Sequence, residues 1–346
     1  MSPTPGSKQS LTFPGDVHHC PSARRPDLNH PRYLYMKTHI VAATLVAAVM
    51  AGLNSGHAGE PAGAPPSRTA ATPRQEVRLE RVTPEYWRVT FDNPPYNLFG
   101  PETIPQLNSV ITQIETDPKV KVVVFQSAVP DFFLTHFDFV PPLSATTDLP
   151  PGVTGLPALP DMLVRLSRAP VVSIVSIRGR ATGVGGELSL ASDMRFASRE
   201  KALLSQWEIG AALVPGGGPM ARLPRLIGRG RALEMLLTGE DISGDLAERY
   251  GYVNRALPDA ELDQFVDTMA RRIAGFDKQS IAAIKRLVDI PTLPSDVEIG
   301  AEWGAFLDSA RRPQAQQDIR RLMEMGLQTN PNVEKHLPES TGSLAR

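Results

Sequence analysis

Hydrophobic and polar residues alternate along the chain with two different periods, and these periods predict its elements. Positions 76–82 and 86–91 alternate with a period of two, which predicts a β-hairpin that turns over Thr83-Pro84-Glu85. The segment 104–114 carries apolar residues at helical spacing, and the unbroken apolar run 120–125 predicts a buried strand. The chain therefore begins its patterned part with two strands, a helix and a strand.

The same succession continues toward the middle of the chain. A helix is expected over 159–166, a strand over 171–177, a helix after Val184 and a strand over 194–197. This order of strands and helices favours an α/β core with parallel strands. Beyond residue 215 the pattern is mostly helical, apart from a short strand over 253–256. Helices are expected over 230–238, after a cap at Ser243, and over 259–273, 278–288 and 296–326.

Composition narrows the range of functions. The formal net charge of the 346 residues is -1, so no basic excess argues for nucleic acid as a partner. The single cysteine, Cys20, excludes an internal disulfide and a cysteine metal cluster. The histidines form neither an HxxxH nor an HExxH pair, so no metal site is expected. Prolines are numerous, and those in the segment 141–160 predict a stiff loop.

The N-terminal region has the pattern of an export signal. Met36 begins a short positive start, an apolar run of about a dozen residues and small residues near Ala58, which predicts a signal peptide over 36–58. Residues 1–35 lack periodicity and are interpreted as a non-native upstream extension or a disordered leader, and 59–75 as a linker. The protein is therefore expected to be exported to the periplasm. The alternative is a leader without an export role and a cytoplasmic protein.

A glycine-rich run over 179–187 is the strongest chemical signal. It follows a predicted buried strand and leads into a helix, and Glu187 stands one turn into that helix. Glycines let backbone N–H groups approach a ligand closely, and a helix N-terminus adds positive partial charge. The run predicts an anion-binding turn next to a carboxylate. The alternative is that Glu187 only favours the helix dipole.

Four segments together resemble the crotonase family, also called enoyl-CoA hydratase/isomerase, over 76–326. The segment 93–98 is similar to the family's NPPxNxL loop, and 131–138 stands where the family has F-x-A-G-A-D. The glycine run matches G-x-A-x-G-G-G-x-E, and 207–218 matches PEI followed by (I/V)PGxGG. Their order and spacing carry the resemblance, since each motif alone is short.

The resemblance implies the fold class and the division of the chain. It implies an α/β fold, a crotonase-like spiral of β-β-α units over 76–256, followed by a helical trimerisation region over 257–328. It also implies a homotrimer or homohexamer. Residues 329–346 show no periodicity and are expected to form a tail.

The resemblance also implies a site. Its oxyanion hole, made of two backbone N–H groups, falls on Phe137 and Val184, and its acid/base carboxylates fall on Glu187 and Glu208. Glu187 would deprotonate water and Glu208 would protonate the substrate Cα. The other positions expected to bind substrate are Tyr96, Asn97, Leu98, His136, Asp138, Gly183, Gly185, Pro215 and Gly216.

Two departures from the family pattern affect this expected site. His136-Phe137 replaces the family's usual Gly-Ala pair, and Val184 stands where glycine is usual. His136 could titrate beside the thioester oxygen, or it could simply pack or bind a backbone carbonyl. A side chain at Val184 could displace the N–H group that the hole requires.

The resemblance implies an enzyme that hydrates an α,β-unsaturated acyl-CoA, with coenzyme A as part of the substrate and no separate cofactor. Two alternatives remain open. One is another reaction of the same scaffold, such as isomerisation or thioester hydrolysis with His136 taking part. The other is an exported binding protein that kept the fold and does not use CoA.

Overall fold

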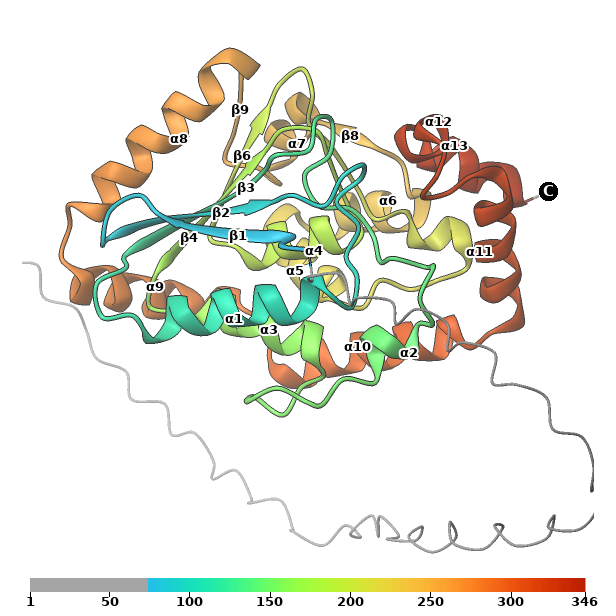
Figure 1. Cartoon of the computed structure of the whole chain (residues 1–346), viewed down its shortest axis with the longest axis horizontal. Coiled ribbons are helices and arrows are strands. Elements are labelled where there is room, and N and C mark those ends of the chain that lie inside the picture. Colours follow the sequence, from blue (N-terminus) through green and yellow to red (C-terminus); the bar gives the residue numbers. More distant parts are fainter. Residues whose placement is uncertain (1–73, 346) are drawn as a thin grey trace, which may run out of the picture. The chain divides into compact units, whose positions relative to one another are not determined.

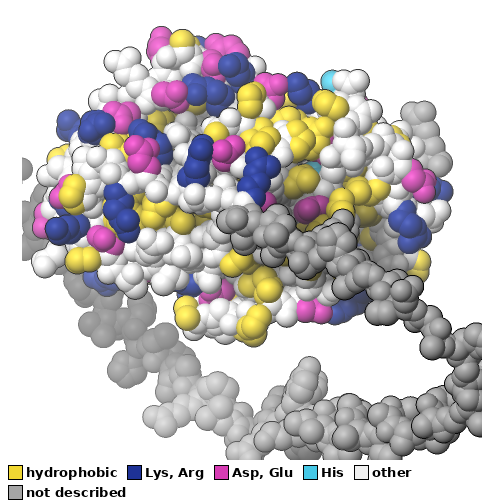
Figure 2. Space-filling view, in the orientation of Figure 1, with side chains coloured by type: hydrophobic (Ala, Val, Ile, Leu, Met, Phe, Trp, Pro, Cys, Tyr) yellow, Lys and Arg dark blue, Asp and Glu magenta, His cyan; other side chains and the backbone are white. Residues whose placement is uncertain are grey.

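The computed structural model describes residues 74–345 of the chain (Figure 1). The expected extension over 1–35, the signal peptide over 36–58 and nearly all of the linker over 59–75 lie outside the described residues. No described helix is both long and apolar enough to cross a membrane. On the face drawn in Figure 2, basic and acidic side chains are interspersed.

A mixed sheet of six strands forms the centre of the fold, in the order β1-β2-β3-β4-β6-β9 (Figure 1). The first two strands make the predicted antiparallel hairpin, and each later neighbour is parallel, as predicted. The strands are β1 (Val77–Arg81), β2 (Tyr86–Phe91), β3 (Val122–Ser127), β4 (Val172–Ile177), β6 (Met194–Ser198) and β9 (Arg255–Leu257).

Helices cover both faces of this sheet because its strands are apolar on both sides. In β3, Val122 and Val124 pack with the helix α8 (Asp259–Ala274), whereas Val123 and Phe125 face the larger core. That core also contains the buried faces of α1 (Thr103–Thr116), α3 (Ala158–Arg168) and α4 (Val184–Ala191). The apolar run over 120–125 is therefore a strand buried on both faces.

Three shorter strands form a second sheet beside the first. They are β5 (Arg180–Thr182), β7 (Leu203–Ser205) and β8 (Ile242–Ser243), in the order β5-β7-β8. None of them exceeds three residues, which is too short for a period to show in the sequence. This small sheet matters because β5 leads directly into α4.

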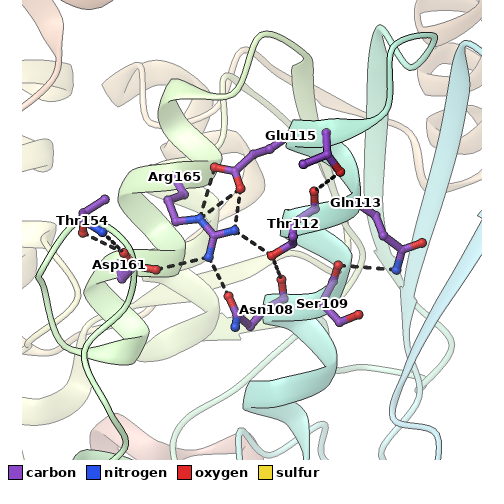
Figure 3. A network of polar contacts seen from close by, with 9 residues as sticks. Asn108, Ser109, Thr112, Gln113, Glu115, Thr154, Asp161 and Arg165 are labelled. Carbon is purple, nitrogen blue, oxygen red and sulfur yellow. Dashed lines mark hydrogen bonds and ion pairs between the residues drawn. The ribbon is translucent and has the colours of Figure 1, made fainter.

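A polar network joins α1 to α3 (Figure 3). The buried guanidinium of Arg165 donates to Glu115 at 3.0 Å, to Asn108 at 2.7 Å and to Asp161 at 3.3 Å. Asp161 in turn accepts the backbone N–H of Thr154 at 2.9 Å. The proline-rich segment 141–160, which also contains α2 (Ser144–Thr147), is therefore tied to the helical layer.

The second half of the chain is helical, as predicted, with one difference. The stretch expected over 296–326 is two helices, α10 (Asp296–Ala310) and α11 (Pro313–Met325). Pro313 lacks an N–H and disfavours helical geometry in the residue before it, so a new helix starts there. Ser243 caps its helix as predicted. The remaining helices are α5 (Pro219–Ile227), α6 (Arg229–Thr238), α7 (Gly244–Tyr250) and α9 (Lys278–Thr292).

The segment 329–346 does not form the expected tail. It contains α12 (Pro331–Lys335), α13 (Leu337–Gly342) and a final turn over Ser343–Ala345, and Figure 1 shows α12 and α13 beside α11, at the end of the fold opposite α8. Leu337 is fully buried in a cluster with Trp207. Each helix has five or six residues, which is too few for a periodic pattern to show in the sequence.

Candidate active site

Three of the four segments that carry the resemblance, 131–138, 179–187 and 207–218, meet around one small cavity of about 20 Å³. This is room for about one water molecule. A larger hollow of about 510 Å³ beside α9 contains neither Glu187 nor Glu208, so size alone would misplace the site. The small cavity is lined by His136, Phe137, Phe139, Gly183, Val184, Glu187, Trp207, Glu208, Leu213, Pro215, Gly216 and Phe306.

The carboxyl group of Glu187 projects from the first turn of α4 and is held by two backbone groups. Its Oε1 accepts the N–H of Gly216 at 3.1 Å and that of Gly217 at 2.6 Å. Burial raises the pKa of Glu187 to about 7, although both N–H groups act in the opposite direction. A Cβ atom on Gly217 would lie 2.3 Å from Oε2, so this position has no room for a side chain.

The second carboxyl group, that of Glu208, comes from the 3-10 turn Trp207–Ala211, labelled η1. Burial, together with the nearby charge of Glu187, raises the pKa of Glu208 to about 8. The side-chain amide of Gln206 lies 3.2 Å from both Glu208 oxygens when its NH₂ group faces them. The cavity thus holds two carboxyl groups that exchange protons near neutral pH, and their titrations belong to the pair.

The backbone N–H of Phe137 points away from Phe99, the residue with which Phe137 forms an isolated β-bridge. Phe99 forms a parallel bridge with Phe137, in which the Phe99 N–H donates to the carbonyl of His136 at 2.9 Å. A trans peptide places its carbonyl and its N–H on opposite sides, so the N–H of Phe137 points away from Phe99. It donates to no backbone acceptor within 74–345.

The second predicted donor, the N–H of Val184, is at the start of α4. It is one of the first N–H groups of the helix and so has no partner four residues back, and it carries part of the positive helix end. Its neighbours are both engaged: Gly183 donates to Ser205 at 3.3 Å and Gly185 to Thr135 at 3.1 Å. Val184 occupies an ordinary helical position, so its side chain does not push this N–H aside.

The two donor segments can approach only because glycine occupies position 185. A Cβ atom there would lie 1.6 Å from the carbonyl oxygen of Leu134. Gly183 has a φ of +54°, a backbone conformation that glycine adopts without strain. The glycine run thus serves to bring α4 against the loop that carries Phe137.

Both ring nitrogens of His136 are occupied. Nδ1 lies 2.8 Å from the carbonyl oxygen of Phe137, and Nε2 lies 3.1 Å from Oε2 of Glu334 in α12. Burial acts to lower the pKa of His136, but Glu334, the Phe137 carbonyl and Asp138 act to raise it, and the net shift is upward. Burial acts to raise the pKa of Glu334 and His136 acts to lower it, and the net shift is downward. Both ring nitrogens of His136 thus face oxygen acceptors, and the contact with a backbone carbonyl is one of the two expectations for this residue.

The structure does not place every predicted substrate position on the cavity. Of those positions, His136, Gly183, Pro215 and Gly216 line it, whereas Tyr96, Asn97, Leu98, Asp138 and Gly185 do not.

Asn97 shows why these positions lie away from the cavity. Asn97 has a φ of +52°, which turns its side chain inward, and its amide donates to Phe133 at 2.6 Å and to Ser127 at 2.8 Å. Tyr96 packs on Phe132 with ring centroids 5.3 Å apart. These residues support the loop before His136 and do not line the cavity.

Glu334 is the residue that the sequence did not reveal. It is fully buried and lies 198 positions from its partner His136. It belongs to a segment without periodicity and matches no motif.

The described part of the chain contains no group of three or more His, Cys, Asp or Glu side chains that could hold a metal ion.

Comparison with known proteins agrees with this geometry. The family model for enoyl-CoA hydratase/isomerase matches residues 86–325. The (E)-benzylidenesuccinyl-CoA hydratase of Thauera aromatica is 31% identical over 231 residues, which are 65% of this chain and 88% of that protein. The crotonyl-CoA hydratase of Syntrophomonas wolfei is 32% identical over 179 residues, 51% of this chain and 67% of that protein.

Solved structures show the same fold. A protein from Streptomyces avermitilis, described as a "putative enoyl-CoA hydratase", superposes with a TM-score of 0.74 at 39% identity, covering 79% of this chain and 99% of that chain. An enoyl-CoA hydratase from Bacillus anthracis superposes with a TM-score of 0.58 at 26% identity, covering 73% and 95%.

Proposed function

The chain belongs to the enoyl-CoA hydratase/isomerase family and is an enzyme of that class, and we propose that it adds water to the double bond of an α,β-unsaturated acyl-CoA. One observation carries this proposal. Two buried carboxyl groups with pKa values of about 7 and about 8 line the same cavity as the residues Phe137 and Val184. Relatives of the chain named as hydratases of crotonyl-CoA and benzylidenesuccinyl-CoA support it.

The two N–H groups would stabilise the intermediate. When water attacks Cβ of the unsaturated thioester, negative charge develops on the carbonyl oxygen as an enolate. Within residues 74–345 the N–H groups of Phe137 and Val184 have no backbone acceptor, and they would donate to that oxygen. Such preorganised donors act most strongly in a site that excludes water, and each is worth about 3 kcal/mol of transition-state stabilisation.

The two carboxyl groups would divide the proton transfers. Glu187, with the lower pKa, is ionised in a larger fraction of molecules and accepts a proton from the water as its oxygen bonds to Cβ. Glu208, with the higher pKa, delivers its proton to Cα. The proton gained by one group balances the proton lost by the other, so the reaction needs no cofactor besides the coenzyme A of the substrate.

The geometry favours hydration over thioester hydrolysis by His136 and over a protein that only binds a ligand. Thioester hydrolysis with His136 as the base would require a free ring nitrogen, and both are engaged. A protein that only binds a ligand has no use for two buried carboxyl groups with pKa values near neutrality. Such groups destabilise a fold, and their presence is typical of catalytic sites.

We also propose that the enzyme is a homotrimer or homohexamer. One side of α9 exposes Ile284, Leu287, Val288 and Ile290, and Phe276 just before it is also exposed. Contiguous exposed apolar side chains of this kind mark association surfaces, and the occupant proposed here is a second copy of the chain. Export by the N-terminal signal is a further proposal, which fractionation of the producing cell would test.

The direct test uses the chain from Gly59 onward with crotonyl-CoA. Hydration removes the absorbance of the conjugated thioester, so its loss measures the reaction. Glu187→Gln and Glu208→Gln keep the side-chain shape without the titrating group, and Glu339→Gln, at an exposed position, serves as the matched control. The proposal expects turnover in the wild type and the control, and a rate at least about a hundredfold lower in the two site variants. Equal rates in all four proteins would refute it.

A further inference from the structure

Residues 328–335 of the C-terminal segment form hydrogen bonds with the loop 136–139, which carries the oxyanion-hole donor Phe137. Gln328 makes two contacts with this loop: its Oε1 accepts the N–H of Phe139 at 2.8 Å, and its Nε2 donates to Oδ1 of Asp138 at 2.6 Å. Glu334 makes the third contact, with His136. The residues on either side of Phe137 are therefore held by the same segment of the chain.

Gln328 and Glu334 are also hydrogen-bonded to each other. The backbone N–H of Gln328 donates to Oε1 of Glu334 at 2.6 Å, and Gln328 adopts a positive φ of +68°. Lys335, next to Glu334, binds Asp131 through its Nζ at 2.8 Å and accepts a hydrogen bond from Arg180 on its carbonyl. The segment is thus fixed both to the loop and to β5, which precedes the other donor, Val184.

His136 transmits this contact to the peptide plane of the donor. Its Nδ1–H donates to the carbonyl of Phe137, and its own carbonyl accepts from Phe99. The carbonyls on both sides of the Phe137 N–H are therefore fixed, which sets the direction of that N–H. The ring also packs between Trp207 and Phe139, with centroids 5.3 Å and 5.5 Å away.

We propose that Glu334 and Gln328 are positioning residues for the oxyanion hole, and that Glu334 keeps His136 protonated as a fixed positive charge beside it. This inference rests on the proposed hydratase function. A carboxylate with no solvent exposure requires a cationic partner, and among the described residues His136 is the side chain that forms an ion pair with Glu334. Glu334 lies outside the motifs that carry the family resemblance and lines no part of the cavity.

The variant Glu334→Gln tests the charge with little change of shape. A glutamine can still hydrogen-bond to Nε2, but it no longer stabilises the imidazolium. We expect kcat to fall about tenfold, less than the about 10²–10³ lost with a whole donor, and KM to change less than about twofold. Gln328→Ala should lower kcat in the same way, and Glu339→Gln, exposed in α13, should leave both constants unchanged.

Hydrogen exchange of the segment 132–139 gives a readout that does not depend on turnover. Exchange there should be about tenfold faster in Glu334→Gln and Gln328→Ala, while exchange in β3 and β4 stays at the wild-type rate and shows that the fold is intact. Unchanged kcat together with unchanged loop exchange would overturn the proposal. An equal increase of exchange throughout the protein would overturn it as well, because the role of the pair would then be general stability.

The failure of the proposed function would look different. If the wild type does not hydrate crotonyl-CoA and the variants still show faster exchange in 132–139, the positioning role of Glu334 and Gln328 is supported and the proposed hydratase reaction is refuted. If the wild type is active and Glu334→Gln keeps both its kcat and its loop exchange, the hydratase stands and the positioning role is wrong.

Discussion

Replacing Glu208 by glutamine should stabilise the folded protein, and the gain should grow with pH. In the folded protein the pKa of Glu208 is raised to about 8, whereas the ordinary value is 4.5. Below pH 4.5 the group is protonated in both states and costs nothing. As pH rises above 4.5 the unfolded chain ionises and the folded chain does not, so stability falls until pH passes about 8. Glutamine has no proton to lose and is free of this cost.

The magnitude follows from the difference between the two pKa values. Each unit corresponds to about 1.4 kcal/mol, so the cost is about 3 kcal/mol at pH 7 and about 5 kcal/mol at pH 9. In a protein of this size, 1 kcal/mol shifts Tm by roughly 1.5–2 °C. Glu208→Gln should therefore melt about 5 °C above the wild type at pH 7. The structure thus predicts a gain in stability and a loss of activity from the same substitution.

The assay is thermal unfolding at fixed protein concentration at pH 5, 7 and 9. The difference in Tm between Glu208→Gln and the wild type should be small at pH 5 and largest at pH 9. Glu339→Gln, at an exposed position, should show no such trend. A difference that is the same at all three pH values, or a variant less stable than the wild type at pH 9, would refute the account of Glu208 as a buried, protonated acid.

Three other predictions follow from the structure. The rate of hydration should rise as pH passes about 7, where Glu187 ionises, and fall as pH passes about 8, where Glu208 loses its proton; a flat profile from pH 6 to 9 would contradict these roles. Gly217→Ala should lower kcat at least about tenfold, since its Cβ would displace the Glu187 carboxyl, and steady-state kinetics would show it. Arg165→Met should lower the free energy of unfolding by about 3 kcal/mol in urea titrations, because it leaves Asp161 buried without its cation, and kcat should be kept.

Much of the fold could be read from the sequence because its elements are long and strongly patterned. The unbroken apolar run of β3 and the helical spacing in α1 each follow from burial that the amino-acid pattern records directly. The strands of the small sheet could not be found, because two or three residues do not establish a period. Pro313, which lacks an N–H, divides the helical stretch expected over 296–326 into two helices.

The site was predictable only where a motif spans it. Glu187, Glu208 and the donors Phe137 and Val184 were placed by the resemblance, and the structure brings all four to one cavity. The sequence did not show that Asn97 binds the loop before His136 and does not line the cavity. The direction of its side chain depends on the positive φ of its backbone, which no sequence pattern records. The sequence also did not show Glu334, because a contact over 198 positions leaves no local pattern.

The size of the cavity determines the order of events when substrate arrives. A space of about 20 Å³ does not admit an acyl thioester, so Phe137, Phe306 or the segments that carry them must move before the substrate enters. An equilibrium between closed and open forms reduces the observed affinity by the fraction of open molecules, so that about 1% open molecules would weaken it about a hundredfold. In rapid-mixing experiments the rate of binding should then reach a plateau at high substrate concentration, and that plateau is the rate at which the closed form opens.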